Sequence, residues 1–488
     1  MKLKIKISTF LFILLLSVSA YAQEDTYIVR FNDSMQLFSA NEKQGINYTV
    51  ATQEELEEYI EAGIVEDYEP NYEVFAIETY AEEAEETQPE VVSNWNFDMV
   101  NAAFAYKVGA MGNDIKVAVI DSGLHSDDMI RAQILNGYDF ITDKPTDKNV
   151  SNDNADGGYH GTIVSSVIAR TNHGYGTGIS PKAHIMPLRV LSYNTAKETN
   201  TGSLDDIIAA IEYATYTDKC DVINLSLGIR ASGIAKDELT TLGEAIQNAV
   251  NEGIIVIAAA GNDGASEYMY PASLDGVISV ASVDYDGTSS EFSQHNDKVD
   301  ISAPGGRMNI AIRYRVENGN GIVSVYTTNG TSISAPHVSG LAAIAKCIKP
   351  EINMAQFEEI LKTTSGRNDR DDYLGYGIIN CESAIKKLIE GRKIYISPVS
   401  IRDVNEANYT GKVSEVIIYN NTDNSLDFEM IYALYNSDST LGTVKKGQGT
   451  LAKEKSGLWQ VKYSGGNVKY MVWDSLKNMV PLAPSSFK

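Results

Sequence analysis

The sequence predicts an α/β protein with a mainly parallel sheet covered by helices on both faces, flanked by two smaller units. Between residues 93 and 392, short strands that are almost wholly apolar alternate with helical patterns. Strands that are apolar on both faces belong to a covered sheet, and alternation with helices is typical of parallel strands. After residue 392, runs rich in Val, Ile and Tyr predict a small all-β sandwich over residues 393–488.

The chain begins with the features of an export signal. Three lysines within the first six residues precede an apolar run over residues 10–20, and Ala-Tyr-Ala at 20–22 suits a signal peptidase. Because about 20 apolar residues are needed to span a bilayer, a signal peptide over residues 1–22 is favoured over a membrane anchor. We therefore expect a secreted, extracellular protein with no membrane span after signal removal.

Residues 23–92 form a small acidic α+β unit in this interpretation. The run at 26–31 predicts a strand, Thr52 caps a helix that carries Leu56 on its apolar face, and residues 72–77 predict another strand. The acidic stretch at 82–86 is typical of a solvated, flexible linker.

The elements of the two later units follow from the same patterns. In the large unit we expect strands over 116–120, 222–226, 254–260 and 277–281, and helices near 161–170, 203–216, 239–252 and 336–347. In the last unit we expect strands over 413–419, 428–435 and 468–473, with a hairpin turn at 464–467. That unit contains no histidine or cysteine, so no chemistry is expected in it.

Composition excludes some classes of function. The 488 residues carry a formal net charge of −25, which argues against nucleic acid as a partner because phosphates require a basic face. Three cysteines in an exported chain do not indicate a disulfide framework, and nothing resembles metal-ligand spacing. Cys220 and Cys347 are expected to be small core residues.

Four polar residues stand at strand ends or helix starts, where functional groups of α/β proteins gather. Asp121 and Asn262 each follow an apolar strand, and His160 begins a helical pattern after a glycine-rich loop. Ser332 precedes a helix whose unpaired amides favour developing negative charge. Each has an ordinary alternative as a turn, core or capping residue, and Ser334 is a rival nucleophile by composition alone.

Taken together and in this order, these motifs resemble the subtilisin-like serine peptidases, the subtilase family. The matching stretches are VAVIDSG (117–123), HGT (160–162), INLSLG (223–228), AAAGN (258–262), YPAS (270–273), APGG (303–306) and GTSISAPHVSG (330–340). The order Asp, His, Ser is that of subtilisin. The resemblance covers about residues 95–390 and identifies the serine after Gly330-Thr331, hence Ser332, as the nucleophile.

The resemblance implies a serine endopeptidase with a subtilisin-like fold, which cleaves peptide bonds by the Ser-His-Asp mechanism. Ser332 would attack the peptide carbonyl, and His160 would transfer its proton to the leaving amine. Asp121 would orient the imidazole, while Asn262 and the Ser332 amide would form the oxyanion hole. No cofactor is expected to be required, and the expected partners are protein or peptide substrates.

The resemblance also implies how a substrate binds. An extended peptide would add as a strand between Ser226-Leu227-Gly228 and a stretch near residues 201–203. Residues 23 to about 80 resemble an inhibitory propeptide, which the enzyme would remove itself.

Met269 occupies the position that forms the bottom of the primary specificity pocket in the family. A methionine there fills much of the pocket, which favours a small residue before the scissile bond; the alternative is that Met269 turns into the core. Small residues available for self-cleavage are Ala76, Thr79, Ala81, Ala84 and Thr87.

The chain departs from the family pattern in two places. Ile163 and Ser165 follow the HGT motif where His and a small residue are usual, and we expect their packing to leave activity intact. Residues 172–176 stand where the family has its main calcium loop but keep few oxygen side chains, which does not favour calcium there.

Three alternatives remain open at this point. The first is a pseudoprotease that uses the cleft only for binding, which the intact set of four polar residues argues against. The second is a maturation protease with a single precursor substrate, and the third is a surface adhesin whose sandwich does the main work. No sorting motif at the C-terminus supports the third.

Overall fold

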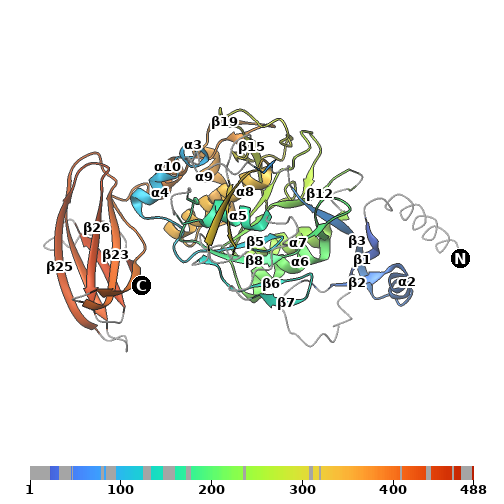
Figure 1. Ribbon diagram of the computed structural model, residues 1–488, viewed down its shortest axis with the longest axis horizontal. Coiled ribbons are helices and arrows are strands. Elements are labelled where there is room, and N and C mark those ends of the chain that lie inside the picture. The colour runs from blue at the N-terminus through green and yellow to red at the C-terminus, as the bar shows by residue number, and fades with distance from the viewer. Residues whose placement is uncertain are drawn as a thin grey trace.

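The computed structural model contains an N-terminal unit, a large central unit and a C-terminal sandwich (Figure 1). The residues that it describes are 22–31, 46, 48–77, 82–83, 95–124, 133–146, 160–171, 177–232, 234, 238–306, 311–317, 320–406, 409–435, 441–463, 467–473 and 486–487. The predicted signal peptide therefore lies outside them, apart from Ala22. No described helix is long and apolar enough to cross a membrane.

The central unit is built on an eight-stranded sheet in the order β16-β15-β13-β11-β5-β8-β6-β7. The strands are β5 (Lys116–Asp121), β6 (Gly137–Asp139), β7 (Lys144–Thr146), β8 (His184–Arg189), β11 (Val222–Leu225), β13 (Ile255–Ala259), β15 (Ile278–Val283) and β16 (Ile301–Pro304). Every neighbouring pair is parallel except β6 and β7. The carboxyl ends of the parallel strands therefore lie at one edge.

Helices cover both faces of this sheet, as predicted. Val117 and Val119 of β5 belong to a core shared with α5 (His160–Ala169) and α8 (Thr331–Ile348). Ala118 and Ile120 alternate with them and belong to a second core. That core is shared with α6 (Leu204–Glu212), which a π-helical turn at Tyr213–Thr217 extends, and with α7 (Thr240–Asn251).

The remaining helices of the central unit are α3 (Trp95–Met99), α4 (Ala103–Val108), α9 (Met354–Thr364) and α10 (Cys381–Leu388). Its smaller strands are β9 (Ser192–Asn194), β10 (Thr199–Ser203), β12 (Leu227–Arg230), β14 (Met269–Tyr270), β17 (Ala311–Glu317), β18 (Asn320–Thr327), β19 (Gly366–Asp371) and β20 (Gly375–Gly377). Cys220, Cys347 and Cys381 are free thiols.

Helix α8 begins at Thr331, five residues before the expected start, and therefore includes Ser332 and encloses Pro336. Proline has no backbone N–H, so it cannot satisfy the carbonyl one helical turn before it. That carbonyl belongs to Ser332, and it accepts a hydrogen bond from the Ser226 hydroxyl instead (2.8 Å). A side chain of the substrate edge thus replaces the missing backbone donor.

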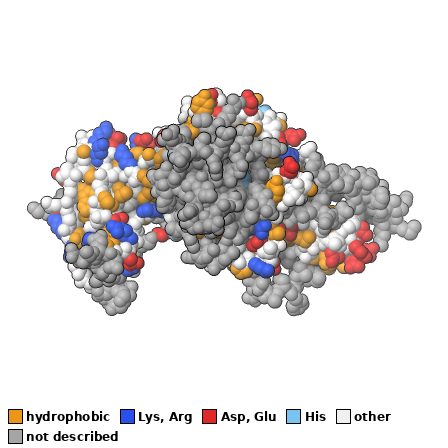
Figure 2. Space-filling model, viewed as in Figure 1, with side chains coloured by type: hydrophobic (Ala, Val, Ile, Leu, Met, Phe, Trp, Pro, Cys, Tyr) orange, Lys and Arg blue, Asp and Glu red, His pale blue; other side chains and the backbone are white. Residues whose placement is uncertain are grey.

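The N-terminal unit pairs β1 (Ala22–Phe31) with β2 (Tyr48–Thr52) and β3 (Val65–Ala76), both antiparallel. Helix α2 (Gln53–Glu61) begins at the predicted cap, and Thr52 and Glu55 form a capping box. The acidic side chains of α2 gather at one end of the molecule (Figure 2). Strand β3 is longer than predicted, because residues 65–70 pair with β1 before its last residues leave this unit and pair with β10 and β12.

Part of the expected linker is a strand. Residues Glu82–Glu83 form β4 and pair with β18, whereas residues 84–86 lie outside the described part of the chain.

The C-terminal unit is an antiparallel sandwich, as predicted. One sheet contains β21 (Ile394–Ile396), β22 (Ser400–Glu406), β23 (Tyr409–Asn420) and β26 (Ser456–Tyr463). The other contains β24 (Leu426–Tyr435), β25 (Leu441–Leu451), β27 (Val468–Trp473) and β28 (Ser486–Phe487). The sandwich contacts the central unit where the Tyr419 ring meets Phe104 at 5.6 Å. Residues 464–466 of the expected hairpin turn are not described.

Candidate active site

Asp121 and His160 meet at the carboxyl end of β5. The carboxylate of Asp121 is fully buried, and its Oδ1 lies 2.8 Å from Nδ1 of His160. The same oxygen accepts a hydrogen bond from the Ser122 amide at 2.7 Å. Because a carboxylate accepts only, Nδ1 of His160 carries the proton, and Nε2 is the nitrogen that can accept one.

Gly161 makes this approach possible. A Cβ at Gly161 would lie 2.2 Å from the carbonyl oxygen of Gly123, so only glycine lets the start of α5 press against the turn after β5. The Gly161 amide donates to the Ser122 hydroxyl at 3.0 Å, which ties the helix start to that turn. The HGT motif therefore places His160 through its glycine.

Ser332 and Asn262 converge on Gly330. A Cβ at Gly330 would lie 2.9 Å from Oγ of Ser332 and 3.0 Å from Nδ2 of Asn262, and the glycine has φ +149°. The hydroxyl and the amide thus lie beside one point at the N-terminus of α8. Oγ of the rival Ser334 lies elsewhere, against Gly305, where a Cβ would come within 2.1 Å of it.

The side chain of Asn262 is oriented by Thr331. Its Oδ1 accepts hydrogen bonds from both the backbone amide and the hydroxyl of Thr331, each at 2.9 Å. The Thr331 hydroxyl in turn accepts from the Gly261 amide at 3.1 Å. With Oδ1 held by Thr331, Nδ2 of Asn262 is left to donate to a carbonyl in the site. No motif in the sequence indicated this role of Thr331.

The end of β3 lies between β10 and β12, the two strands expected to hold a substrate. On one side Ala76 pairs with Leu227 and Phe75 with Gly228, all antiparallel. On the other side residues 73–75 pair with residues 201–203, also antiparallel.

Ile77 completes this strand at the Asn262 amide. Its amide donates to the Ser226 carbonyl at 3.2 Å, and its own carbonyl accepts from Nδ2 of Asn262 at 3.0 Å. The Ile77 carbonyl oxygen also lies 3.4 Å from the Cβ position of Gly330, beside Oγ of Ser332. A peptide carbonyl thus stands next to a nucleophilic hydroxyl and an amide donor.

Met269 lies beside Gly228, the residue of β12 that pairs with Phe75. Its Cγ lies 2.8 Å from the Cβ position of Gly228, and its Cε lies 3.1 Å from that of Gly261. Met269 and Ile77 are both buried and belong to the same apolar cluster. The side chain of Met269 thus spans the space between the two glycines. Ile77, whose carbonyl accepts from the Asn262 amide, is larger than the small residues expected before the scissile bond.

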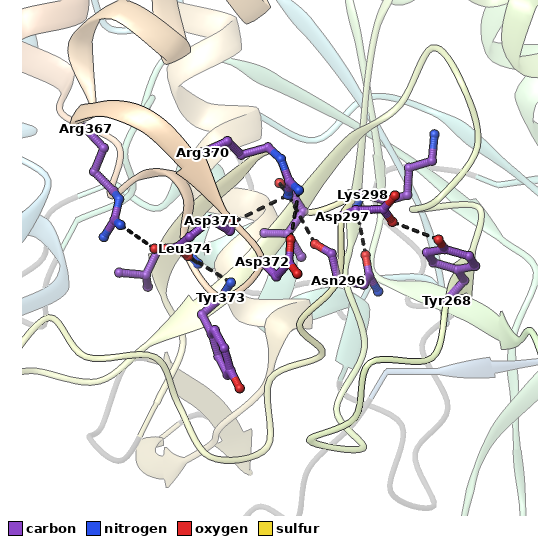
Figure 3. A network of polar contacts seen from close by, with 11 residues as sticks. Tyr268, Asn296, Asp297, Lys298, Arg367, Arg370, Asp371, Asp372, Tyr373 and Leu374 are labelled. Atoms are coloured by element: carbon purple, nitrogen blue, oxygen red, sulfur yellow. Dashed lines mark hydrogen bonds and ion pairs between the residues drawn. The ribbon is translucent and has the colours of Figure 1, made fainter.

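A polar network joins the loop at residues 296–299 to Tyr268 and to β19 (Figure 3). Tyr268 donates to Asp297 at 2.8 Å, and Nη1 of Arg370 donates to the carbonyls of Asn296 at 3.2 Å and Val299 at 3.1 Å. Arg370 also pairs with Asp372 at 2.8 Å. One guanidinium therefore ties β19 to the loop that contacts Tyr268, the neighbour of Met269.

His337, the histidine of the serine motif, is structural. Nδ1 of His337 lies 2.8 Å from the Ile333 carbonyl, and Nε2 lies 2.9 Å from the side-chain amide of Asn96. Since a carbonyl only accepts, Nδ1 donates and Nε2 accepts. Burial lowers the pKa of His337 to about 4, so the ring stays neutral.

Among the described residues, no group of His, Cys, Asp and Glu is arranged to hold a metal ion. Residues 172–176, where calcium was not favoured, lie outside the described residues, so that expectation stays a prediction.

Comparisons with known proteins identify the family of this chain. The subtilase family model matches residues 112–377, which is more than half of the chain. An alkaline protease of Shouchella clausii is 31% identical over 390 residues, covering 76% of this chain and 94% of that protein. Subtilisin Savinase of Lederbergia lenta is 32% identical over 295 residues, covering 60% of this chain and 98% of that protein.

A third relative and one solved structure extend the comparison. The minor extracellular protease Epr of Bacillus subtilis is 32% identical over 291 residues, covering 58% of this chain and 40% of that protein. A solved protease from Pseudoalteromonas arctica matches with a TM-score of 0.50 and 28% identity, covering 60% of this chain and 97% of the other.

Proposed function

The chain belongs to the subtilase family and is a subtilisin-like serine endopeptidase, and on that premise we propose that Asp121, His160 and Ser332 form its catalytic triad. Asn262 would supply a donor of the oxyanion hole. The observation that carries this proposal is the hydrogen bond from Nδ2 of Asn262 to the Ile77 carbonyl, beside Oγ of Ser332.

The proposed chemistry follows from these positions. Ser332 attacks the substrate carbonyl while Nε2 of His160 takes its proton, and the Asp121 carboxylate stabilises the imidazolium through Nδ1. The carbonyl oxygen gains negative charge, which Nδ2 of Asn262 and the first amides of α8 stabilise. His160 then protonates the leaving amine. In the second half of the reaction His160 takes a proton from the water that attacks the acyl-enzyme and returns it to the Ser332 oxygen.

We further propose that residues 23–77 are an inhibitory propeptide that the enzyme removes itself. Ile77 lies as a substrate residue would, with its amide on the Ser226 carbonyl and its own carbonyl on the Asn262 amide. The bond cut in maturation would therefore be the one between Ile77 and Glu78. Until it leaves, the end of β3 fills the cleft between β10 and β12 and excludes other substrates.

We propose that the protein is exported with removal of residues 1–22. The sequence of that segment supports this, and the Bacillus subtilis relative is named an extracellular protease.

Two serine substitutions test the proposal. Ser332→Ala should abolish casein hydrolysis and leave residues 23–77 attached, whereas Ser334→Ala should keep activity, because Oγ of Ser334 lies against Gly305. Mass spectrometry of both secreted proteins would give their N-termini. Cleavage of the Ser332→Ala chain after Ile77 would show that another protease performs maturation, and activity of that variant would overturn the triad.

A further inference from the structure

We propose that Lys197 and Arg230 form a cationic clamp that selects an aromatic residue at the third position before the scissile bond. The same clamp would favour an acidic residue at the fifth position. This inference rests on the proposed function, because positions are counted back from Ile77. Phe75 then stands at the third position and Glu73 at the fifth.

The side chains of β3 alternate between two faces of the strand in the cleft. Val74 and Ala76 are buried in the core that lies beneath the sheet, with 0% and 6% of their surface exposed. Phe75 and Glu73 point to the opposite face and are only partly buried. Because successive residues of a strand alternate, a substrate in the same register presents its third and fifth residues to that face.

Two cations approach the Phe75 ring, one from each wall of the cleft. Nζ of Lys197 lies 5.9 Å from the ring centroid and comes from the turn between β9 and β10. The guanidinium of Arg230 lies at the same distance of 5.9 Å and comes from the end of β12. Both lie within the range of about 6 Å in which a cation is attracted to an aromatic face.

The two cations are held differently. Arg230 makes a paired contact with Asp263, through Nε at 3.0 Å and Nη2 at 2.9 Å, so its position does not depend on the substrate. Nζ of Lys197 instead lies 2.6 Å from Oε1 of Glu73, which is the fifth residue itself. Lys197 thus joins the two preferences, since the acid at the fifth position holds the lysine beside the ring.

The two cations beside Phe75 stand in a chain that is strongly acidic overall. It carries 65 acidic residues against 40 Lys and Arg, yet a cation stands on each wall at the same substrate position. A net-acidic enzyme that places cations there would attract an electron-rich ring and a carboxylate, and would disfavour lysine or arginine at these positions.

The test uses four peptides with Val, Ala and Ile at the fourth, second and first positions. They carry Phe or Ala at the third position, combined with Glu or Gln at the fifth, and kcat/KM is measured with the mature enzyme. Two exposed cation–aromatic contacts predict a preference for Phe over Ala of about tenfold. An exposed ion pair predicts a smaller preference for Glu over Gln, about two- to threefold.

Variants of the enzyme assign the preference to the clamp. Lys197→Ala and Arg230→Ala should each lower the Phe-to-Ala ratio to about threefold, and the double variant should bring it near one. Only Lys197→Ala should remove the Glu preference. Lys219→Ala and Arg402→Ala are matched controls, because these exposed residues pair with Glu252 and Glu415, away from the cleft. Both should keep the wild-type ratios.

The outcomes separate the two proposals. A ratio near one in the wild type, or a ratio unchanged in the double variant, overturns the clamp while Ser332-dependent cleavage still supports the protease. Cleavage that does not depend on Ser332 overturns both. A circular dichroism spectrum and a thermal midpoint equal to those of the wild type show that the double variant is folded.

Discussion

At the scale of single residues, the site depends on groups that do not carry the chemistry. Asn262 could be predicted from its place after an apolar strand. Thr331, which fixes the orientation of Asn262, could not, because that role requires Thr331 and Asn262 to meet across the fold. Gly161 and Gly330 belong to motifs that were recognised in the sequence, but the structure explains why glycine is required at both positions. A Cβ at either position would lie within 3.0 Å of a neighbouring atom.

We predict that Thr331→Val lowers kcat about three- to tenfold with little change in KM. The substitution removes the hydroxyl donor to Oδ1 of Asn262, and one such hydrogen bond contributes about 0.5–1.5 kcal/mol. Loss of the Asn262 amide itself should cost more, about 10²–10³ in kcat. Steady-state kinetics on one peptide would measure both. Thr331→Ser should restore kcat, and an effect on KM alone would contradict this role.

Met269 carries a prediction about the residue before the scissile bond. Its side chain spans the space between Gly228 and Gly261, so the pocket should accept Ile, Val and smaller residues better than Phe, Tyr or Leu. Met269→Gly should open the pocket and shift the preference toward Phe, Tyr and Leu, by about 1–3 kcal/mol for each methylene accommodated. Peptide-library profiling of both enzymes decides this. A wild-type preference for Phe that Met269→Gly leaves unchanged would show that the methionine does not line the pocket.

At the scale of elements, apolar patterning predicted most of the central sheet. Strands β5, β13 and β15 lie within one or two residues of the expected ranges, because strands buried on both faces have continuous apolar runs. The start of α8 was placed too late, because Pro336 marks a first turn in sequence statistics. Here the Ser226 hydroxyl satisfies the carbonyl that proline leaves without its N–H. A contact so distant in the chain has no local signal.

The pairing of strand β3 likewise depends on long-range contacts that have no local sequence signal. Its apolar run at 72–77 was identified, but its pairing with β10 and β12 joins two units of the chain. Periodicity shows which residues face inward, not which edge the strand meets. The register that puts Ile77 at Asn262 is therefore a property of the folded molecule.

The Arg370 network gives a prediction about stability (Figure 3). Arg370→Ala should lower the thermal midpoint of the inactive Ser332→Ala chain by several degrees, because the backbone carbonyls of Asn296 and Val299 lose a charged hydrogen-bond donor. Arg367→Ala is the matched control, since Arg367 forms an exposed ion pair with Asp371 four residues along, and such pairs contribute little. Calorimetry compares the two. Equal midpoints would show that the loop is held by other contacts.

At the scale of the whole molecule, the N-terminal unit holds the central unit by capping its helices. Oδ1 of Asn71 accepts a hydrogen bond from the Asp205 amide in the first turn of α6, at 3.1 Å. Oε2 of Glu69 accepts from the Thr241 amide in the first turn of α7, at 3.2 Å. These amides lack partners within their own helices. Arg30 adds an ion pair to Glu244 at 2.9 Å.

Glu69 makes the affinity of the N-terminal unit for the central unit depend on pH. Burial, with a smaller contribution from the Asp67 charge, raises the pKa of Glu69 from 4.5 to about 7, although hydrogen bonds from α7 oppose the shift. A carboxyl whose pKa is higher in the assembled form than in the released form binds a proton on assembly. Raising the pH from about 4.5 to 7 therefore weakens the assembly, and lowering it strengthens the assembly.

We predict that the cleaved N-terminal unit stays bound at pH 5.5 and is released more readily at pH 8. The measurement uses the Ser332→Ala chain with a specific protease site placed within residues 84–86, cut and then passed over gel filtration at both pH values. Glu69→Gln keeps an acceptor for the Thr241 amide but cannot ionise, so retention should become nearly independent of pH. Glu57→Gln, on the exposed side of α2, should keep the wild-type dependence. If Glu69→Gln still releases its N-terminal unit at pH 8 as the parent does, another group at the interface sets the pH response.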